Sequence, residues 1–528
     1  MKIAFRQMCV TLCGRFGPDE GGVAGYVDRI GTKYAAKWGV QMVGMNFQTD
    51  PRSERSKMEM RMEDFGLSPK TVLRFLATTE DMKSLYSLTV VKDGRTLLDR
   101  YFKPFHRELY RDLYSVSKSV VSLAVGVAVD QGKLRLEDRP ADFFAEELRG
   151  EYDPRVKDIT VRNLLNMSAS SAYTSNTFRG KDCNWRTLYL GLPLPDDPGK
   201  AFHYDTGAPY MLACMVSKAM GQPCGQVLKS YVFEPMGIKD CVWSTDPEGN
   251  ITGGWDCFMR AGDYVRLGQL ILNLGSWNGE QLISREYMSE AVSELIPTLD
   301  NPGVGWCYGY GFLFWRWPDD TFGCFGAFGQ LIICSPRKNL YVATTAGLSI
   351  EDNRRLALAV IETLVGEAQS QPLKRDDLAY RQLCEALEGR DMEYPRGESR
   401  MEAVERGGFD SLWRFPDNDS GIEALSFRRL DDRTIQVKMG WSGRDVQFRA
   451  GYQMWMEEKL DLGHEILQDH AFAYAWTSGN TLMIRHYLLN TAYVKTYTLS
   501  FEGGKVRLTV TQNVVIPGAE AGVEVESR

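Results

Sequence analysis

Residues 113–132 read Leu-Tyr-Ser-Val-Ser-Lys-Ser-Val-Val-Ser-Leu-Ala-Val-Gly-Val-Ala-Val-Asp-Gln-Gly. The run is apolar on nearly every side and stops at a glycine, which predicts a helix buried at the centre of the protein. Lys118 lies near its start, where loss of water disfavours the charged amine, so the amine must be neutralised, paired or used. Ser115 precedes it by three positions and shares its helix face. The two side chains can therefore come within hydrogen-bond reach, which is how a weak nucleophile is activated.

The Ser-x-x-Lys pattern is short, and chance supplies it readily in a chain of 528 residues. A second copy, Ser335-Pro-Arg-Lys338, lies between two apolar runs. Its proline and the polar residues after it predict a hairpin turn, not a helix. What favours a catalytic role for Ser115 and Lys118 over a chance match is their place at the head of a buried helix.

The length of 528 residues exceeds what one hydrophobic core usually supports, which predicts two domains and tails. The formal net charge is only -7, and no basic cluster is interleaved with aromatic residues. We therefore expect neither nucleic acid nor a membrane as a partner. The apolar stretch within the first 15 residues is too short to span a bilayer and is a poor signal sequence.

The eleven cysteines are odd in number, scattered and without a CxxC pair, which is typical of free thiols in a reducing compartment. The sequence therefore predicts a cytoplasmic protein. The five histidines form no HExxH or similar ligand pattern, so we expect no metal site and no cofactor.

Composition and pattern divide the chain into four segments. Residues 1–60 show no sustained period and predict a poorly ordered extension. Residues 61–370 carry strand patterns at both ends with helix patterns between them. Residues 371–404 are rich in charge and predict a linker or helix. Residues 405–528 show short alternating strands, which predict a separate all-β domain, either a sandwich or a barrel.

The second segment predicts an α+β layer. Ser68 is placed to cap a helix, and Asp93-Gly94 is a strong signal for a hairpin between two strands. Residues 308–315 and the two runs after them indicate consecutive antiparallel strands, and residues 353–365 indicate a closing helix. We therefore expect the first and last strands of this segment to share one antiparallel sheet.

Four motifs occur in an order that resembles a known superfamily: residues 113–118, 159–168, 204–206 and 326–336. Over roughly residues 65–370 the chain is similar to the serine β-lactamases and penicillin-binding proteins. It most resembles the class C-like serine hydrolases, which include esterases, D-amino-acid peptidases and 6-aminohexanoate-dimer hydrolase. The resemblance implies an antiparallel sheet flanked by helices, with an all-helical subdomain.

The same resemblance implies a tyrosine that moves protons, which here would be Tyr204 in Tyr204-Asp-Thr206. Held near the lysine ammonium, its phenol would ionise more easily and carry the serine proton to the leaving group. Tyr173-Thr-Ser175 offers a competing match, but Tyr204 directly precedes an apolar helix. Thr206 stands where the family has asparagine, and its hydroxyl would contact the substrate with one hydrogen bond.

The third family motif aligns with Cys324-Phe325-Gly326, so the cation that grips a substrate carboxylate is missing. The missing cation argues against β-lactam hydrolysis and D,D-peptidase activity. The resemblance places an oxyanion hole at the backbone N–H groups of Ser115 and Ala327, beside a Gly326 that allows close approach. Tyr173, Trp255 and Trp306 are candidates for the lining of the cleft, with ordinary aromatic packing as the alternative.

Together these residues imply a serine hydrolase that cleaves an amide or ester bond of a small molecule through an acyl-serine. A binding or scaffold protein that kept the fold and lost the chemistry is the alternative, which the altered third motif favours. The sequence leaves open the identity of the substrate, the choice between amidase and esterase, the oligomeric state and the role of the C-terminal domain.

Overall fold

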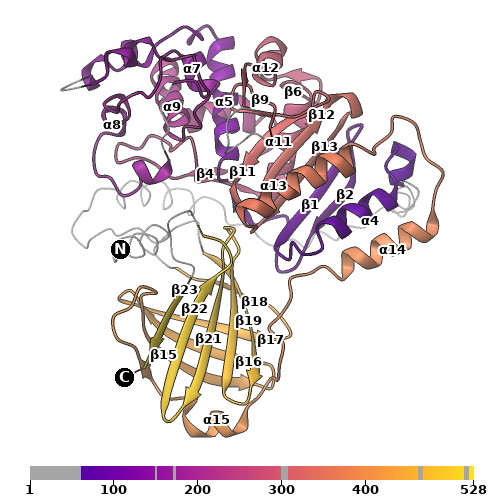
Figure 1. The fold of residues 1–528 in the computed structure, drawn as a ribbon, viewed down its shortest axis with the longest axis vertical. Coiled ribbons are helices and arrows are strands. Elements are labelled where there is room, and N and C mark those ends of the chain that lie inside the picture. The colour runs from indigo at the N-terminus through magenta and orange to yellow at the C-terminus, as the bar shows by residue number, and fades with distance from the viewer. Residues whose placement is uncertain are drawn as a thin grey trace, which may run out of the picture.

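The fold is taken from a computed structural model, which describes residues 61–148, 152–169, 174–298, 307–461, 468–515 and 522–527. The predicted extension over residues 1–60 lies outside the described residues. A part built of helices and a sheet comes first along the chain, and a curled all-β sheet follows it (Figure 1). The structure thus confirms the predicted α+β class with a separate all-β C-terminal region.

The first part is organised by an eight-stranded antiparallel sheet. The first hairpin turns at Asp93-Gly94, where both residues have positive φ, as predicted. Strand β1 then pairs with β13, so Leu88 lies opposite Thr344 and the two ends of this part share one sheet. The strand order is β2 (Arg95–Tyr101), β1 (Leu85–Lys92), β13 (Leu340–Ala346), β12 (Gln330–Ser335), β11 (Phe322–Gly326), β10 (Trp315–Arg316), β9 (Gly309–Tyr310) and β8 (Ile296–Pro297).

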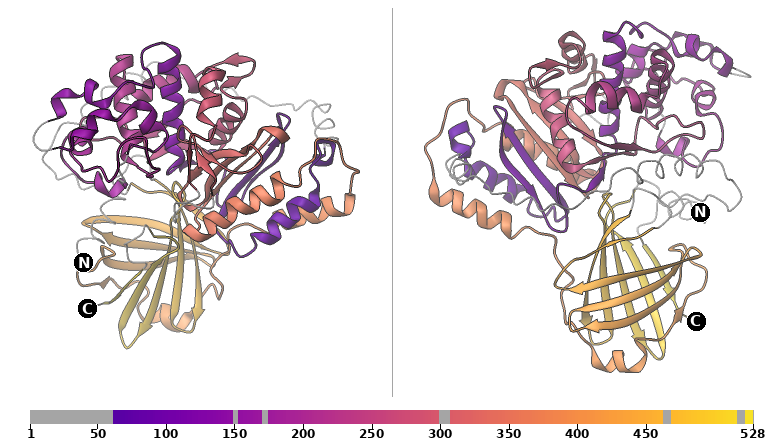
Figure 2. Two further views of the ribbon diagram at one scale, coloured as in Figure 1. Left: turned by 45° about the horizontal axis from the view of Figure 1, so that its top comes forward. Right: turned by 180° about the vertical axis from the view of Figure 1, so that it is seen from behind.

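Helices cover both faces of this sheet (Figure 2). Helix α11 (Ala261–Leu272) packs on β12 and β13, and Gly268 lets the ring of Tyr341 approach, since a Cβ there would lie 2.4 Å from it. Helices α4 (Pro69–Thr78) and α13 (Ile350–Ala359) lie on the opposite face, with α14 (Asp377–Glu388) beside α4 (Figure 1). Ser68 caps α4 by accepting a hydrogen bond from the backbone N–H of Lys70, as predicted.

A helical region forms the other half of this part, with α5 (Val116–Asp130) at its centre (Figure 1). Every residue of α5 from Val116 to Ala128 is buried, as the apolar run predicted. Its buried hydroxyls have partners: Ser119 donates to the carbonyl of Leu313 at 2.6 Å, and Ser122 lies 3.1 Å from the Tyr287 hydroxyl. The helices around it are α6 (Pro140–Phe143), α7 (Val161–Leu165), α8 (Trp185–Leu190), α9 (Gly207–Met220), α10 (Cys224–Leu228) and α12 (Arg285–Ala291).

The stretch 308–315, predicted as one strand, is divided into β9 and β10. Leu313 between them has φ 65°, and its N–H donates to the carbonyl of Leu165 at 2.8 Å. The turn is therefore held against α5 and α7 by tertiary contacts that strand periodicity does not encode. Within the described ranges, none of the helices combines the length and the apolar character that crossing a bilayer demands.

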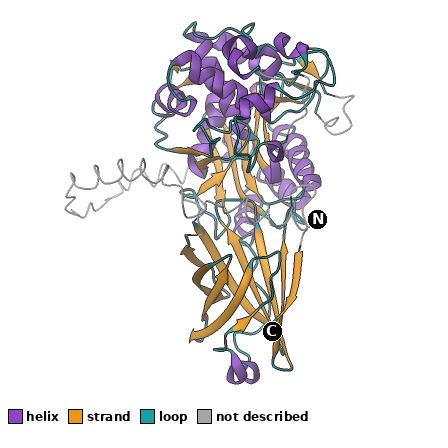
Figure 3. Ribbon diagram, turned by 90° about the vertical axis from the view of Figure 1, so that its left-hand side faces the viewer, coloured by secondary structure: helices purple, strands orange, loops and turns teal. Residues whose placement is uncertain are grey.

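The C-terminal part is one curled sheet of ten strands (Figure 3). Neighbouring strands in this sheet are antiparallel except β17 and β19, which pair in parallel over two residues. A core of aromatic and aliphatic side chains fills it, and α15 (Glu402–Gly408) lies at one end. The strands are β14 (Trp413–Arg414), β15 (Ile422–Asp431), β16 (Thr434–Trp441), β17 (Arg444–Tyr452), β18 (Met456–Lys459), β19 (Asp469–Ser478), β20 (Thr481–Leu488), β21 (Val494–Glu502), β22 (Lys505–Gln512) and β23 (Gly522–Glu526).

The turn between β20 and β21 joins this sheet to the first part of the chain. The short strand β3 (Tyr110–Asp112), which leads into α5, is held by Asn490. The Asn490 side-chain NH2 donates to the Tyr110 carbonyl at 3.0 Å, and the backbone carbonyl of Asn490 accepts from the Asp112 N–H at 2.8 Å. The Ala492 N–H donates to the Tyr114 hydroxyl at 3.0 Å. The C-terminal sheet therefore contacts the segment immediately before Ser115.

Two histidines lie buried and in contact inside the C-terminal sheet. Nδ1 of His470 is 2.8 Å from Nε2 of His486, whose Nδ1 is 3.2 Å from the Tyr497 hydroxyl. Burial, together with the neighbouring His470, holds the pKa of His486 well below its usual range. The folded protein therefore keeps His486 neutral at pH values where an unfolded chain would bind a proton.

We expect this pair to make the protein less stable in mild acid. Below about pH 6.5 His486 is protonated in the unfolded chain but stays neutral in the folded protein. The free energy of unfolding therefore falls by up to about 1.4 kcal/mol per pH unit. Urea unfolding at pH 7.5, 6.0 and 5.0 measures it. His486→Gln should flatten the dependence, while His106→Gln, an exposed control, should keep it. Equal slopes in all three proteins would contradict the assignment.

Candidate active site

Ser115 and Lys118 meet at the start of α5, as predicted. The Lys118 ammonium donates to the Ser115 hydroxyl oxygen at 3.1 Å, and its side chain is only 1% exposed. Tyr114, just before the serine, has φ 47°, a conformation that costs free energy for a residue with a side chain. Its N–H donates to the carboxylate of Asp112 at 2.8 Å, which helps to hold this sharp entry into the helix.

The Lys118 amine has a second partner in the carbonyl of Gly254, at 2.8 Å. Burial lowers the pKa of Lys118 to about 7, and the nearby carboxylate of Asp205 opposes that shift. An amine with this pKa is partly neutral at physiological pH, which an exposed lysine is not. Lys118 can therefore accept a proton from the hydroxyl that it contacts.

Close packing fixes the position of the Gly254 carbonyl. A Cβ at Gly254 would lie 2.5 Å from the carbonyl oxygen of Thr206, and one at Gly253 would lie 2.6 Å from that of Pro209. Only glycines allow this loop to approach the start of α9 so closely. The loop thus joins the segment of Tyr204 and Thr206 to Lys118.

The rest of the loop is held by aromatic stacking and an ion pair. The Trp255 ring is 5% exposed and stacks on the rings of Trp185 and Phe178, with centroids 5.8 and 6.1 Å away. Asp256, at φ 54°, accepts from the Arg179 guanidinium at 2.7 Å. Trp255, a candidate for the cleft lining, is thus buried by aromatic packing within the loop.

Tyr204 lies beside the pair on α5. The Lys118 ammonium is 5.0 Å from the centroid of its ring, which also stacks on Trp315 at 5.5 Å. Burial raises the pKa of Tyr204 to about 12, although a hydrogen bond with Ser115 opposes the shift. The phenol is therefore harder to ionise than a free tyrosine, and not easier as the sequence led us to expect.

Asp205, between Tyr204 and Thr206, is a buried carboxylate that the sequence patterns did not assign a role. It accepts from the Gly207 N–H at 2.7 Å and from the Tyr189 hydroxyl at 2.8 Å. Thr206 precedes α9 as its N-cap residue. Asp205 therefore holds the first residue of α9, and its negative charge favours the ammonium form of Lys118.

The third motif forms the end of β11 beside the entry into α5. A Cβ on Gly326 would lie 2.7 Å from the carbonyl of Leu113, so the strand meets the chain just before Ser115. The carbonyl of Gly326 accepts from the Asn353 side chain at 3.0 Å. Ala327 and Tyr114, the residue before Ser115, pack against the same small apolar cluster.

The side chains of this motif are uncharged. Cys324 is fully buried, and burial raises the pKa of its thiol to about 12, while a hydrogen bond with Ser119 opposes that. Phe325 is half-buried, with its ring 6.4 Å from that of Trp315. Phe325, Trp315 and Tyr204 thus form a chain of ring contacts, and its Tyr204 end lies beside Lys118.

Two predicted site residues, Tyr173 and Trp306, lie outside the described residues. Among those that are described, no group of three His, Cys, Asp or Glu side chains is placed to hold a metal ion. The Gly254 carbonyl was missed by sequence reasoning because a backbone acceptor carries no side-chain signal. The Gly253-Gly254 pair was the available clue, since adjacent glycines often mark a close approach.

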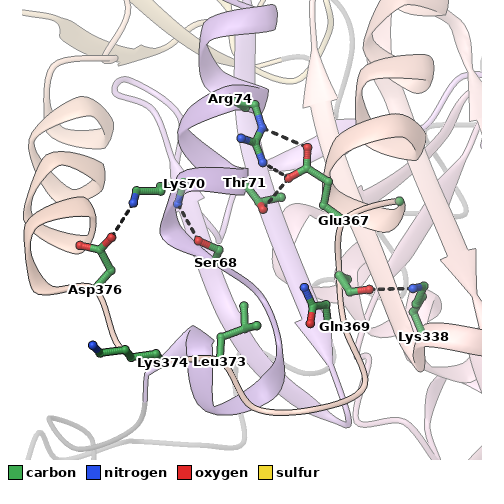
Figure 4. A pocket seen from close by; sticks show the side chains of 12 residues that line it. Ser68, Lys70, Thr71, Arg74, Lys338, Glu367, Gln369, Leu373, Lys374 and Asp376 are labelled. Atoms are coloured by element: carbon green, nitrogen blue, oxygen red, sulfur yellow. Dashed lines mark hydrogen bonds and ion pairs between the residues drawn. The ribbon is translucent and has the colours of Figure 1, made fainter.

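A polar pocket of about 660 Å³ lies elsewhere, at α4 and the segment before α14 (Figure 4). Lys70 pairs with Asp376 at 2.8 Å, and Arg74 pairs with Glu367 at 3.0 Å. Lys338 donates to the carbonyl of Ala368 at 2.7 Å from the turn between β12 and β13, which confirms that the second Ser-x-x-Lys copy is a hairpin turn. Because three of the four cations that line this pocket are already paired, we place the candidate site at α5.

Comparison with known families supports the same region. Residues 80–364 match the profile of the family described as Beta-lactamase, and residues 1–60 match that of a family of unknown function.

Esterase EstB of Burkholderia gladioli is 28% identical over 170 residues, which are 28% of this chain and 42% of the esterase. The 6-aminohexanoate-dimer hydrolase of Paenarthrobacter ureafaciens is 25% identical over 229 residues, 39% of this chain and 56% of that enzyme. The chain thus spans about half the length of these curated relatives. The octameric penicillin-binding protein homologue from Pyrococcus abyssi is a solved structure with 16% identity and a TM-score of 0.45, covering 86% of this chain and 99% of that one.

Gly254→Ala tests whether the loop holds Lys118. The added methyl meets the Thr206 carbonyl, so we expect a loss of about 1–3 kcal/mol in the free energy of unfolding. Lys118 should also become accessible to acetic anhydride, as measured by mass spectrometry of peptides. Gly225→Ala is the control, because its Cβ would meet only Ile251 at 3.7 Å. If both variants show equal stability and equal Lys118 labelling, the loop does not hold the amine.

Proposed function

The chain belongs to the beta-lactamase family, and we propose that it is a serine hydrolase that cleaves an amide or ester bond of a small molecule. The observation that carries this proposal is the 3.1 Å contact between Ser115 Oγ and a buried Lys118 whose pKa is lowered to about 7. The names of its relatives, an esterase and a 6-aminohexanoate-dimer hydrolase, support both bond types.

In the first step, neutral Lys118 takes the proton of Ser115 as Oγ attacks the substrate carbonyl. The carbonyl oxygen gains the negative charge, and the backbone N–H groups of Ser115 and Ala327 are the donors that would stabilise it. Among the described residues the N–H of Ser115 makes no hydrogen bond outside regular helices and strands, so it is available for this role.

Collapse of the tetrahedral intermediate breaks the bond to the leaving group and leaves the acyl group on Ser115. The leaving amine or alkoxide needs a proton, and Tyr204 is the donor we assign. Because the pKa of Tyr204 is raised to about 12, its phenol is protonated near neutral pH. Tyr204 gives its proton to the leaving group as the Lys118 ammonium replaces it, so the tyrosine relays a proton without lasting ionisation.

Water then attacks the carbonyl carbon of the acyl-serine, and Ser115 Oγ becomes the leaving group. Lys118, neutral again, draws the proton of that water through Tyr204 and returns one to Ser115 Oγ as the acid leaves. The Asp205 carboxylate favours the charged form of Lys118 and therefore stabilises each intermediate that carries the ammonium. No external cofactor is needed to balance either step.

The walls of the site favour an uncharged substrate. Cys324 and Phe325 stand where relatives of this family carry a cation for a substrate carboxylate, and neither can supply a positive charge. Half-buried Phe325 packs against the buried Trp315 ring, which in turn stacks on Tyr204. We therefore assign neutral esters or amides with an apolar portion as the substrate class, in preference to penicillins and peptides with a free carboxylate.

A fluorophosphonate probe tests the nucleophile. We expect one covalent adduct, located on Ser115 by peptide mass spectrometry and absent from Ser115→Ala. Ser335→Ala is the matched control, because it removes the serine of the second Ser-x-x-Lys copy and should leave labelling intact. A chain that no acylating or phosphonylating probe labels, or one labelled at another residue, would favour the non-catalytic binding protein.

The pH dependence of p-nitrophenyl butyrate hydrolysis tests the base. With the pKa of Lys118 at about 7, the amine is protonated below that pH and cannot accept the serine proton. We therefore expect kcat/KM to fall by about tenfold per pH unit below 7. Lys118→Met should lower kcat by roughly 10²–10⁴-fold, while Lys133→Met, at an exposed position, should keep rate and profile. An acid limb near pH 4.5 would indicate a carboxylate base instead.

A further inference from the structure

Two cysteines outside the proposed chemistry lie within reach of one another. Cys241 begins β4 (Cys241–Trp243) and Cys257 begins β5 (Cys257–Arg260), and the two strands are antiparallel neighbours. Trp243 lies opposite Cys257, and Cys241 lies opposite Met259, so the cysteines are diagonal neighbours. Their sulfur atoms are 3.1 Å apart. A disulfide bond measures about 2.05 Å, so closing it requires a movement of only about 1 Å.

The two thiols differ in their access to solvent. Cys257 is fully buried, whereas Cys241 is partly exposed at the end of its strand. A soluble oxidant can therefore reach Cys241 first, and Cys257 lies behind it as the resolving thiol. Burial and the contact with Cys241 both raise the pKa of Cys257, so its thiol stays protonated until Cys241 has reacted. The difference in exposure gives the order of the two-step exchange.

Cys257 is also tied to the catalytic helix by its backbone. Its N–H donates to the hydroxyl of Ser117 at 3.2 Å, and its carbonyl accepts from the N–H of Leu113 at 2.9 Å. The segment between the two cysteines contains Gly254, whose carbonyl binds Lys118. A covalent link between the cysteines would therefore close a loop that carries part of the candidate site.

We propose that Cys241 and Cys257 are a redox site that forms a reversible disulfide with a low-molecular-weight disulfide such as glutathione disulfide. The Cys241 thiolate attacks the oxidant, forms a mixed disulfide and releases one glutathione thiolate. Cys257 then attacks Cys241 Sγ, forms the intramolecular bond and releases the second glutathione. The two cysteines lose two protons and two electrons, and the oxidant gains both as two thiols. The cross-link constrains the unfolded chain between positions sixteen apart and should stabilise this region.

Glutathione disulfide alone is the probe, used on the full chain after reduction. We expect thiols counted in denaturant to fall by two from the eleven of the sequence, and a peptide joining Cys241 to Cys257 to appear. The urea midpoint should rise on oxidation and return with dithiothreitol. Cys241→Ser should abolish the joined peptide and the rise in midpoint, while Cys183→Ser, at an exposed thiol, should change neither.

Failure to form the joined peptide, with all thiols retained or blocked only by glutathione, would overturn the proposal. A joined peptide that uses other cysteines would do the same. Cys241→Ser is preferred to a change at Cys257, because the buried residue can disturb folding when altered. The peptide and the thiol count are read by mass, so their result is independent of whether the chain hydrolyses an ester.

Discussion

The interaction on which the site depends is the burial of one lysine amine. A lysine amine that is buried away from water needs hydrogen-bond acceptors in fixed positions, or its neutral form is favoured. Lys118 has such acceptors and also a lowered pKa. Its amine meets the Ser115 hydroxyl and the Gly254 carbonyl, and its pKa falls to about 7. Each acceptor belongs to a different segment of chain. The requirement to bring them together determines how those segments pack.

The loop that carries Gly254 connects those segments. It approaches the start of α9 through two glycines, stacks Trp255 on a neighbouring aromatic cluster, and pairs Asp256 with Arg179. The turn between β20 and β21 holds the strand before Ser115 through Asn490. The C-terminal sheet therefore has a structural role next to the site, because the backbone before Ser115 is hydrogen-bonded to a turn of that sheet.

The same packing bears on substrate choice and on redox chemistry. At the end of β11, Cys324 is buried and Phe325 is half-buried, and the Phe325 ring packs against Trp315, which stacks on Tyr204. The backbone N–H of Cys257 donates to Ser117 in α5, and its thiol lies 3.1 Å from that of Cys241. A disulfide between the two cysteines would therefore constrain the loop that holds Lys118.

The sequence alone determined the features that are local. Ser115 and Lys118 fall within one helical turn, so their contact follows from helix geometry, and the burial of α5 follows from its apolar run. Asp93-Gly94 likewise specified its hairpin. Only the tertiary structure decided that Gly254 accepts from Lys118, that Leu313 divides the strand predicted at 308–315, and that Asn490 bonds to β3. Those contacts join residues far apart in the chain, and periodicity records which face is buried but not which distant partner covers it. The pKa of Tyr204 was mispredicted for the same reason, because desolvation by the surrounding rings outweighed its hydrogen bond to Ser115.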